Sequence, residues 1–206
     1  MRSTLITAAA LVALVSSAHA QTRNLSNFSG VSAADRIHVE VSQGENYRVE
    51  VFGSDASRVQ TRVDNDGTLE IRRTNRPFWG ETPPIDATVR VTMPTVRRLA
   101  SSRGAELTAS NIAANSMSLA AAMGGELRVN GTCTNVSAAA SMGGSIRAEG
   151  FECRDANIDA SMGGDARVFA SNRFDAAASM GGAVNVSGGG RSSNISTSMG
   201  GSVESR

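Results

Sequence analysis

The chain has 206 residues, a formal net charge of +1 and many small residues, with 30 Ala, 27 Ser and 21 Gly against eight aromatic residues. The scarcity of large apolar residues argues against a helical bundle, four Pro are too few for a collagen-like chain, and the balanced charge argues against a disordered tail. All 20 basic residues are Arg. These features favour a chain that packs small side chains in a repetitive way.

Residues 1–20 have the form of a secretory signal peptide. Arg2 precedes a short apolar run that ends at Val15, and Ala-His-Ala closes the segment as a cleavage site. The run is too short to span a bilayer, which takes about 20 apolar residues, and no other segment could cross as a helix. Without Arg2, residues 21–206 carry 19 Arg and 19 acidic residues. We therefore expect an exported protein without a nucleic-acid partner, either periplasmic or extracellular at the cell surface of a Gram-negative bacterium.

Residues 21–100 contain most of the aromatic residues and alternate apolar with polar residues in short runs. A period of two is typical of strands. The runs within 37–51 and within 59–71 are each interrupted by turn residues, so we interpret each pair as a hairpin-like unit. A Pro-rich stretch that contains Trp79 follows and is expected to loop out from one coil. Trp79 is either a platform on which a sugar stacks or a cover for apolar surface of the cap.

Five Met-Gly-Gly triplets give residues 101–206 a period of about 19 residues. The triplets begin at Met123, Met142, Met162, Met180 and Met199, and Ser102-Arg103-Gly104-Ala105 is a degenerate sixth copy. Each triplet lies between two runs of period two, and Gly allows the chain to turn between them. Such repeats predict the coils of a parallel β-solenoid. Residues 21–206 are then a single domain, in which 21–100 provide an N-terminal β cap and the first coils.

Equivalent residues of successive coils should stack about 4.8 Å apart. We interpret the five Met as an internal ladder that fills a narrow core lined by Ala, since Met adapts to irregular space. The alternative is a thioether array that binds a metal. The residues directly before the Met, mostly Ser, are expected to form a flat outer face suited to a glycan or to another molecule of the protein.

A row of arginines follows from the same alignment. Arg128, Arg147 and Arg167 each lie five residues after a Met and are expected to point outward. Such a row could hold an anionic polymer. The alternative is a solvated face with exposed ion pairs, each contributing less than about 1 kcal/mol to stability.

Cys133 and Cys153 each lie nine residues before a Met, so they should stack on adjacent coils. Because export places them in an oxidising compartment, we predict a disulfide between them. The alternatives are two free thiols or a metal site. A zinc site would need two further ligands, and His38 is the single His of the mature chain. We expect no metal and no cofactor.

Several motifs in this order resemble the putative auto-transporter adhesin, head GIN domain family. The motifs that carry the resemblance are Asn27-Phe28-Ser29-Gly30-Val31, Ile37-His38-Val39-Glu40-Val41, Tyr47-Arg48-Val49-Glu50-Val51, Gly67-Thr68-Leu69-Glu70-Ile71 and Val89-Arg90-Val91-Thr92-Met93-Pro94. The resemblance implies a right-handed β-helix on an exported bacterial protein, without an established activity. The chain has Ser-Met-Gly-Gly where the family is expected to have Ser-Gly-x-Gly.

These observations favour a non-enzymatic envelope or surface module that acts as an adhesin, glycan binder or scaffold. Its expected partner is an envelope polysaccharide or another surface protein. The C-terminal coil, which carries no obvious cap, also favours self-association through unpaired strand edges. The alternative is a polysaccharide lyase or hydrolase, which needs clustered carboxylates. Its candidates are Asp155, Asp159, Asp165 and Asp175, but Asp159 and Asp165 lie on opposite sides of a Met-Gly-Gly turn.

Overall fold

The computed structural model describes residues 20–74 and 85–206, and within these residues the chain is all β apart from one 3₁₀ turn at Ala56–Arg58. The strands are β1 (Gln21–Arg23), β2 (Gly30–Ala33), β3 (His38–Gln43), β4 (Arg48–Phe52), β5 (Val59–Val63), β6 (Thr68–Arg73), β7 (Thr88–Met93), β8 (Arg98–Ser102), β9 (Glu106–Ala122), β10 (Glu126–Ser141), β11 (Ser145–Ser161), β12 (Asp165–Ser179), β13 (Ala183–Ser187), β14 (Arg191–Thr197) and β15 (Ser202–Ser205). The proposed signal peptide at 1–20 lies almost wholly outside the described residues.

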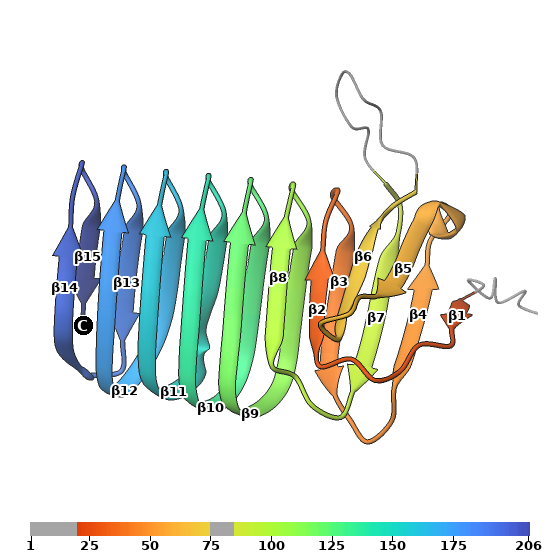
Figure 1. Cartoon of the computed structure of the whole chain (residues 1–206), viewed down its shortest axis with the longest axis horizontal. Coiled ribbons are helices and arrows are strands. Elements are labelled where there is room, and N and C mark those ends of the chain that lie inside the picture. Colours follow the sequence, from red (N-terminus) through yellow and green to blue (C-terminus); the bar gives the residue numbers. More distant parts are fainter. Residues whose placement is uncertain (1–19, 75–84) are drawn as a thin grey trace, which may run out of the picture.

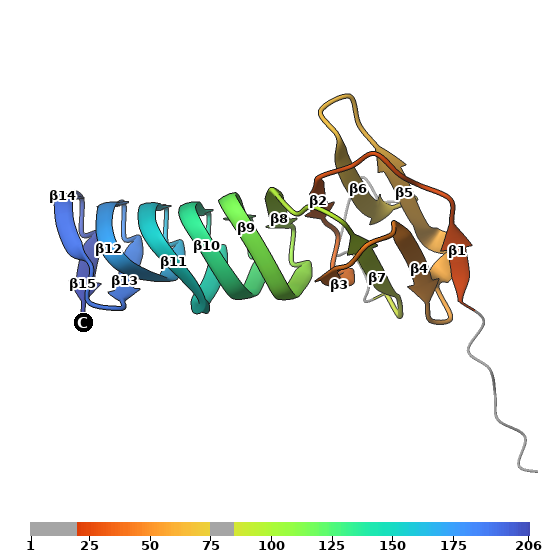
Figure 2. The same cartoon turned by 90° about the horizontal axis from the view of Figure 1, so that it is seen from below.

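The repeats form a β-solenoid. Strands β9 to β12 pair in parallel, each with the next, and Glu126 of β10 lies between Glu106 of β9 and Ser145 of β11. Each long strand runs along one sheet, bends, and returns along the opposite sheet, as the view from below shows (Figure 2). The coils therefore stack side by side along the long axis of the molecule (Figure 1). The predicted solenoid and its repeat length are confirmed.

Alternate residues of both sheets fill the core. In β10, Leu127 and Val129 from one sheet and Val136, Ala138 and Ala140 from the other are buried. Larger residues thus share the narrow interior with Ala, as close packing between two sheets about 10 Å apart requires. The predicted Ala-lined core is confirmed, and it explains the composition of the chain.

The repeat methionines lie outside this core, so the predicted internal ladder is wrong. Their exposed fractions are 46% for Met123, 48% for Met142, 47% for Met162, 48% for Met180 and 79% for Met199. Each strand ends before the Met, which has a φ of 47–51° and precedes a Gly with a φ of 72–77°. A turn with two successive positive φ values is of type I′ when a hydrogen bond joins its ends. In the turn at Met142, Gly144 N donates to Ser141 O at 2.9 Å. The alternation that suggested burial stops one residue earlier, because the left-handed turn points the Met side chain outward.

The same turn occurs twice more towards the N-terminus. Arg103 has a φ of 50° and Gly104 one of 72°, which confirms the degenerate copy. Asp35 and Arg36 also have positive φ values of 64° and 61°, and Arg36 N donates to Arg103 O at 3.2 Å. This turn contains no Gly, so no glycine in the sequence predicted it. The turns follow one another along a single edge of the stack, which we call the turn edge (Figure 1).

The N-terminal strands form a mixed region with an order that the sequence did not predict. Strand β3 is parallel to β7, and β7 is antiparallel to β4, so β7 separates the two strands of the first predicted hairpin. The hairpin predicted over 37–51 is therefore wrong, because β7, which follows later in the chain, lies between β3 and β4. Strands β5 and β6 are antiparallel neighbours, as predicted.

Strands β2 and β3 form a coil between two others, since β2 pairs with β6 and β8 while β3 pairs with β7 and β9. Antiparallel strands β1, β4 and β5 cover this end of the stack (right in Figure 1). A solenoid needs such a cover because its core is otherwise open at each end. The Pro-rich excursion and Trp79 fall in residues 75–84, outside the described residues.

Candidate binding site

One sheet presents alternating charges to solvent, which we call the charged face. The Arg128 guanidinium lies 2.7 Å from a carboxylate oxygen of Glu126, which also lies 3.3 Å from Arg147. Arg167 lies 3.2 Å from Asp165. Each arginine of the predicted row therefore points outward and already has an acidic partner. An anionic polymer would have to displace these carboxylates, so the arrangement favours the ion-pair alternative over an anion-binding row.

The charged face continues into the N-terminal region. His38 Nδ1 lies 3.5 Å from a carboxylate oxygen of Glu106, and His38 Nε2 lies 3.7 Å from Glu40. Arg90 Nε donates to Glu40 at 2.7 Å, and this hydrogen bond raises the pKa of the Arg90 guanidinium above its ordinary value. The Arg90 guanidinium also lies over the Phe52 ring, 4.8 Å from its centroid. The row of paired charges thus runs along several coils.

The opposite sheet carries small and amide side chains, which we call the small-residue face. Its two central outward rows are Ser118, Ser137, Asn157, Asp175 and Asn194, and Ala120, Ala139, Asp159, Ala177 and Ser196. The register confirms the predicted outward rows: Ala120, Ala139, Asp159 and Ala177 align on successive coils, as do the residues directly before the Met, Ala122, Ser141, Ser161 and Ser179. Asp159 lies on this face whereas Asp165 lies on the charged face, so two carboxylates considered for a lyase do not converge. Within residues 20–74 and 85–206, no three His, Cys, Asp or Glu side chains gather to hold a metal ion.

An open groove lies along the edge opposite the turns, where the long strands bend, and we call it the bend groove. It has a volume of about 800 Å³, within the range of ligand sites. Four segments form it: the end of β3, the residues between β7 and β8, and the bends of β9 and β10. The polar side chains that line it belong to Gln43, Thr95, Arg97, Asn115, Ser116, Thr132 and Thr134.

Gln43 joins the segments that form the groove. Its Nε2 donates to Pro94 O at 2.9 Å, and its Oε1 accepts from Ala113 N at 2.8 Å. These bonds tie the β7–β8 connection to the bend of β9. The arginines of the predicted row do not line the groove, and sequence reasoning missed its residues because they come from four separate segments of ordinary turn composition. The non-repeating polar residues at the first bends, such as Asn115 and Thr134, were the available signal.

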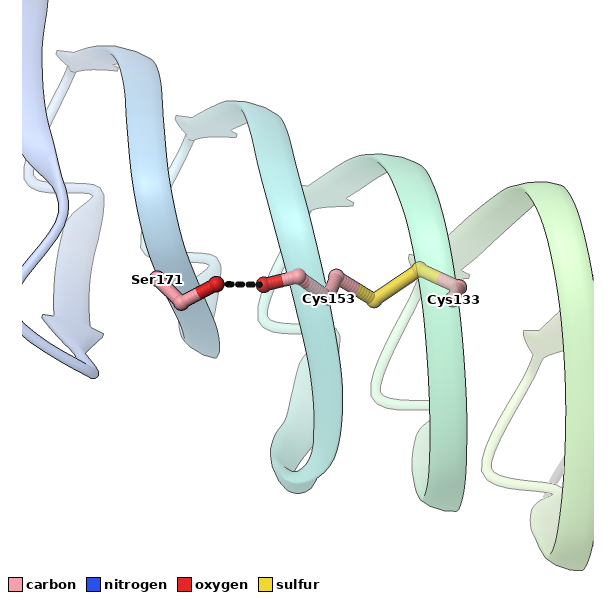
Figure 3. The surroundings of a disulfide bond; sticks show 3 residues. All are labelled: Cys133, Cys153 and Ser171. Carbon is pink, nitrogen blue, oxygen red and sulfur yellow. Dashed lines mark hydrogen bonds between the residues drawn. A yellow bond between two sulfur atoms is a disulfide. The ribbon is translucent and has the colours of Figure 1, made fainter.

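A disulfide lies beside the bend groove. Cys133 and Cys153 are bonded, with Cα atoms 4.4 Å apart on adjacent coils β10 and β11 (Figure 3). Cys133 lines the groove, and the register of both coils shifts close to the bond. On the next coil, Ser171 Oγ donates to Cys153 O at 3.4 Å. The bond therefore holds two bends together where the ladder between them is irregular.

Comparisons with known proteins agree with this architecture. The family model described as putative auto-transporter adhesin, head GIN domain, matches residues 27–190. A solved structure of a putative adhesin from Bacteroides fragilis is similar with a TM-score of 0.66 and 14% identity, over 91% of this chain and 96% of that one. A putative lipid binding protein from Parabacteroides distasonis has a TM-score of 0.49 at 17% identity, over 91% and 96% of the two chains. At 14% identity the Bacteroides fragilis structure shows the fold alone.

No curated protein matches the sequence. Among the described residues, no helix has the length and apolar character needed to cross a membrane.

Proposed function

Because the chain belongs to the putative auto-transporter adhesin, head GIN domain family, we propose that it is an exported, non-enzymatic, adhesin-like module that binds a polysaccharide of the cell envelope in the bend groove. The observation that carries this proposal is the groove itself. Hydroxyl and amide groups of Thr95, Asn115, Ser116 and Thr134 line it at exposed positions, and Arg97 adds one cation. Hydroxyl and amide groups can both donate and accept hydrogen bonds, which suits the hydroxyl groups of a sugar chain.

The construction of the groove supports binding without large rearrangement. Gln43 ties two of its walls to each other through hydrogen bonds, and the disulfide anchors the wall at Cys133 to the next coil, β11. A preformed site loses less conformational entropy when it binds a ligand than a site that must be ordered. The charged face is a weaker candidate for the same ligand because its arginines are paired with Glu126 and Asp165.

The disulfide and the family are those of an extracytoplasmic protein, because disulfides persist in oxidising compartments. We place the mature protein in the periplasm or at the cell surface. Cleavage after Ala20, as the sequence indicates, is tested by N-terminal sequencing of the exported protein. A mature chain that begins with Gln21 supports the assignment, and a retained N-terminus contradicts it.

A glycan array with purified protein tests the binding proposal. The double variant Asn115→Ala/Thr134→Ala removes two polar groups of the groove and should weaken binding about tenfold, since each hydrogen bond contributes about 0.5–1.5 kcal/mol. The matched control Ser137→Ala/Asn157→Ala removes the same kinds of group from the small-residue face and should leave binding unchanged. Absence of any bound glycan, or equal losses in the two variants, would refute a polysaccharide site in the groove. Cleavage of a bound glycan that disappears in Asp159→Ala/Asp165→Ala would instead support the lyase alternative.

We also propose that a second copy of the chain covers the last coil. Within the described residues β14 pairs with β12 alone and β15 with β13 alone, so each leaves one edge unpaired. Ile195 is in register with buried Ala176, yet it is 46% exposed. A second copy that paired with these edges would satisfy their backbone groups and would also cover Ile195. Light scattering after size-exclusion chromatography should show a dimer that Ile195→Asp converts to a monomer. A monomeric wild type at high concentration would contradict the proposal.

A further inference from the structure

The turn edge carries five exposed thioethers in a single row, which we call the methionine row: Met123, Met142, Met162, Met180 and Met199. The carbonyl oxygen of each Met accepts a hydrogen bond, at 3.1–3.2 Å, from a backbone N–H of the preceding turn. Successive methionines are thereby held one strand spacing apart, about 4.8 Å. The turns that carry the row are aligned along one edge of the stack, at the top of Figure 1, and the bends of the long strands lie along the opposite edge.

The turn itself does not require Met. Asp35 and Arg103 occupy the same position in earlier coils with the same left-handed backbone. A residue with a Cβ in this conformation costs about 1–2 kcal/mol relative to the right-handed one, and Gly, Asn and Asp are the usual residues of such turns. Met nevertheless recurs in five successive turns, and 46–79% of each residue is exposed. The turn conformation therefore does not explain the recurrence of Met, and the exposed part of each side chain is available to a ligand.

A thioether is a neutral, polarizable donor on a flexible side chain. Soft sulfur ligands select soft cations such as Cu(I) and bind hard cations poorly. Within the turns, the neighbours of each Met are Ser or Ala before it and two Gly after it, so no charged group competes for the same position. We propose that the methionine row binds soft monovalent cations, Cu(I) or Ag(I), each held between thioethers of neighbouring turns.

Adjacent turns are the smallest unit that can form such a site. Two neighbouring Met side chains, one strand spacing apart, can direct both sulfur atoms towards a cation that lies between the turns. Five methionines in a row contain two separate adjacent pairs, so the row should hold two ions at once. The site is distinct from the bend groove and does not depend on the proposed glycan.

Adjacency provides a sharp test. Ag(I), which needs no reducing agent, is titrated into the folded protein with its disulfide intact, and binding is followed by calorimetry. The wild type should bind two ions. Met142→Leu/Met180→Leu keeps three thioethers but leaves none of them adjacent, and should lower the affinity at least tenfold. Met123→Leu/Met199→Leu removes the same number of thioethers but leaves three adjacent ones, and should still bind one ion tightly.

Leu preserves the size and apolar character of the row, so these variants separate metal binding from docking of an apolar partner. The proposal is overturned if the wild type binds no Ag(I), or if the two double variants behave alike. A second measurement uses the wild type alone, so it is independent of whether a variant folds. Two bound ions occupy four of the five thioethers, so saturating Ag(I) should lower oxidation of the methionine row by hydrogen peroxide, as measured by mass spectrometry. Buried Met93 and Met117 should stay unoxidised either way. Equal oxidation of the row with and without Ag(I) would also overturn it.

Discussion

The two glycines of a Met-Gly-Gly turn are required for different reasons, and substitutions with Ala should separate them. Gly143 has a φ of 72°, and among the described residues no atom lies within 4 Å of a Cβ added there. Gly144 lies outside the left-handed region, but an added Cβ would be 2.3 Å from Ala121 O and 2.4 Å from Ala121 C of the preceding coil. The same close approach occurs at the second glycine of the other turns: Gly125, Gly164, Gly182 and Gly201.

The expected costs differ in size. Gly143→Ala places a Cβ in the left-handed conformation and should lower the free energy of unfolding by about 1–2 kcal/mol. In Gly144→Ala the clash is with backbone, which cannot rotate away, so the two coils must separate by several tenths of an ångström. That separation strains the ladder next to the turn, where Ser145 N donates to Gly125 O at 2.9 Å. We expect a loss of about 3 kcal/mol or more, at the upper end for overpacked sites.

Thermal and urea unfolding of both variants, followed by circular dichroism, measure the difference. For a chain of this size 1 kcal/mol shifts Tm by about 2–4 °C, so Gly144→Ala should unfold several degrees below Gly143→Ala. The neighbouring position is the matched control, because the two variants add the same methyl group to the same turn. If Gly144→Ala is as stable as Gly143→Ala or more stable, the close contact between coils does not determine the second glycine.

Three further predictions concern single groups. Met142→Gly should change the free energy of unfolding in urea by less than about 1 kcal/mol, because relief of the left-handed strain offsets the greater backbone entropy that Gly loses on folding. Truncation of a buried Met would instead cost about 2–5 kcal/mol. A thiol titration of denatured, unreduced protein should find no free thiol, and two free thiols would contradict the bond. Cys133→Ser should lower the free energy of unfolding by about 3 kcal/mol, because the bond links residues 20 apart in the sequence. The Asp86 backbone N–H donates to the Asp55 carboxylate and lowers the pKa of Asp55 below its ordinary value of 3.8. The ionised carboxylate therefore stabilises the folded protein fully above that pH, and this contribution is lost as the pH falls below it. Asp55→Asn should therefore lose less stability than the wild type between about pH 4 and pH 2, and parallel acid curves would show that this carboxylate plays no part.

The parts of the fold that depend on the repeat could be predicted from the sequence. A period of about 19 residues with period-two runs specifies coils, and stacking of coils converts the period into register. That register correctly placed the outward arginines and the flat small-residue face. It also led to the expectation that Cys133 and Cys153 lie on adjacent coils, which they do.

The candidate binding surfaces were less accessible to sequence reasoning. The outward direction of Arg128 followed from alternation, but its contacts with Glu126 and Glu106 depend on side-chain reach within and between coils. The bend groove joins Gln43, Asn115 and Thr134, which are far apart in the sequence and belong to no common pattern. Such a site forms only when separate segments meet in the folded protein, so no single local motif predicts it.

By itself, the amino-acid sequence determined the architecture of this protein: stacked coils, an Ala-lined core and turns at the glycines, because each of these follows from local periodicity and the size of side chains. The tertiary structure alone decided which way the methionines point and which strand lies between β3 and β4. The first depends on a reversal of backbone hand at the end of each strand, which a count of alternating residues passes over. The second depends on pairing between strands about 50 residues apart, which local patterns do not encode.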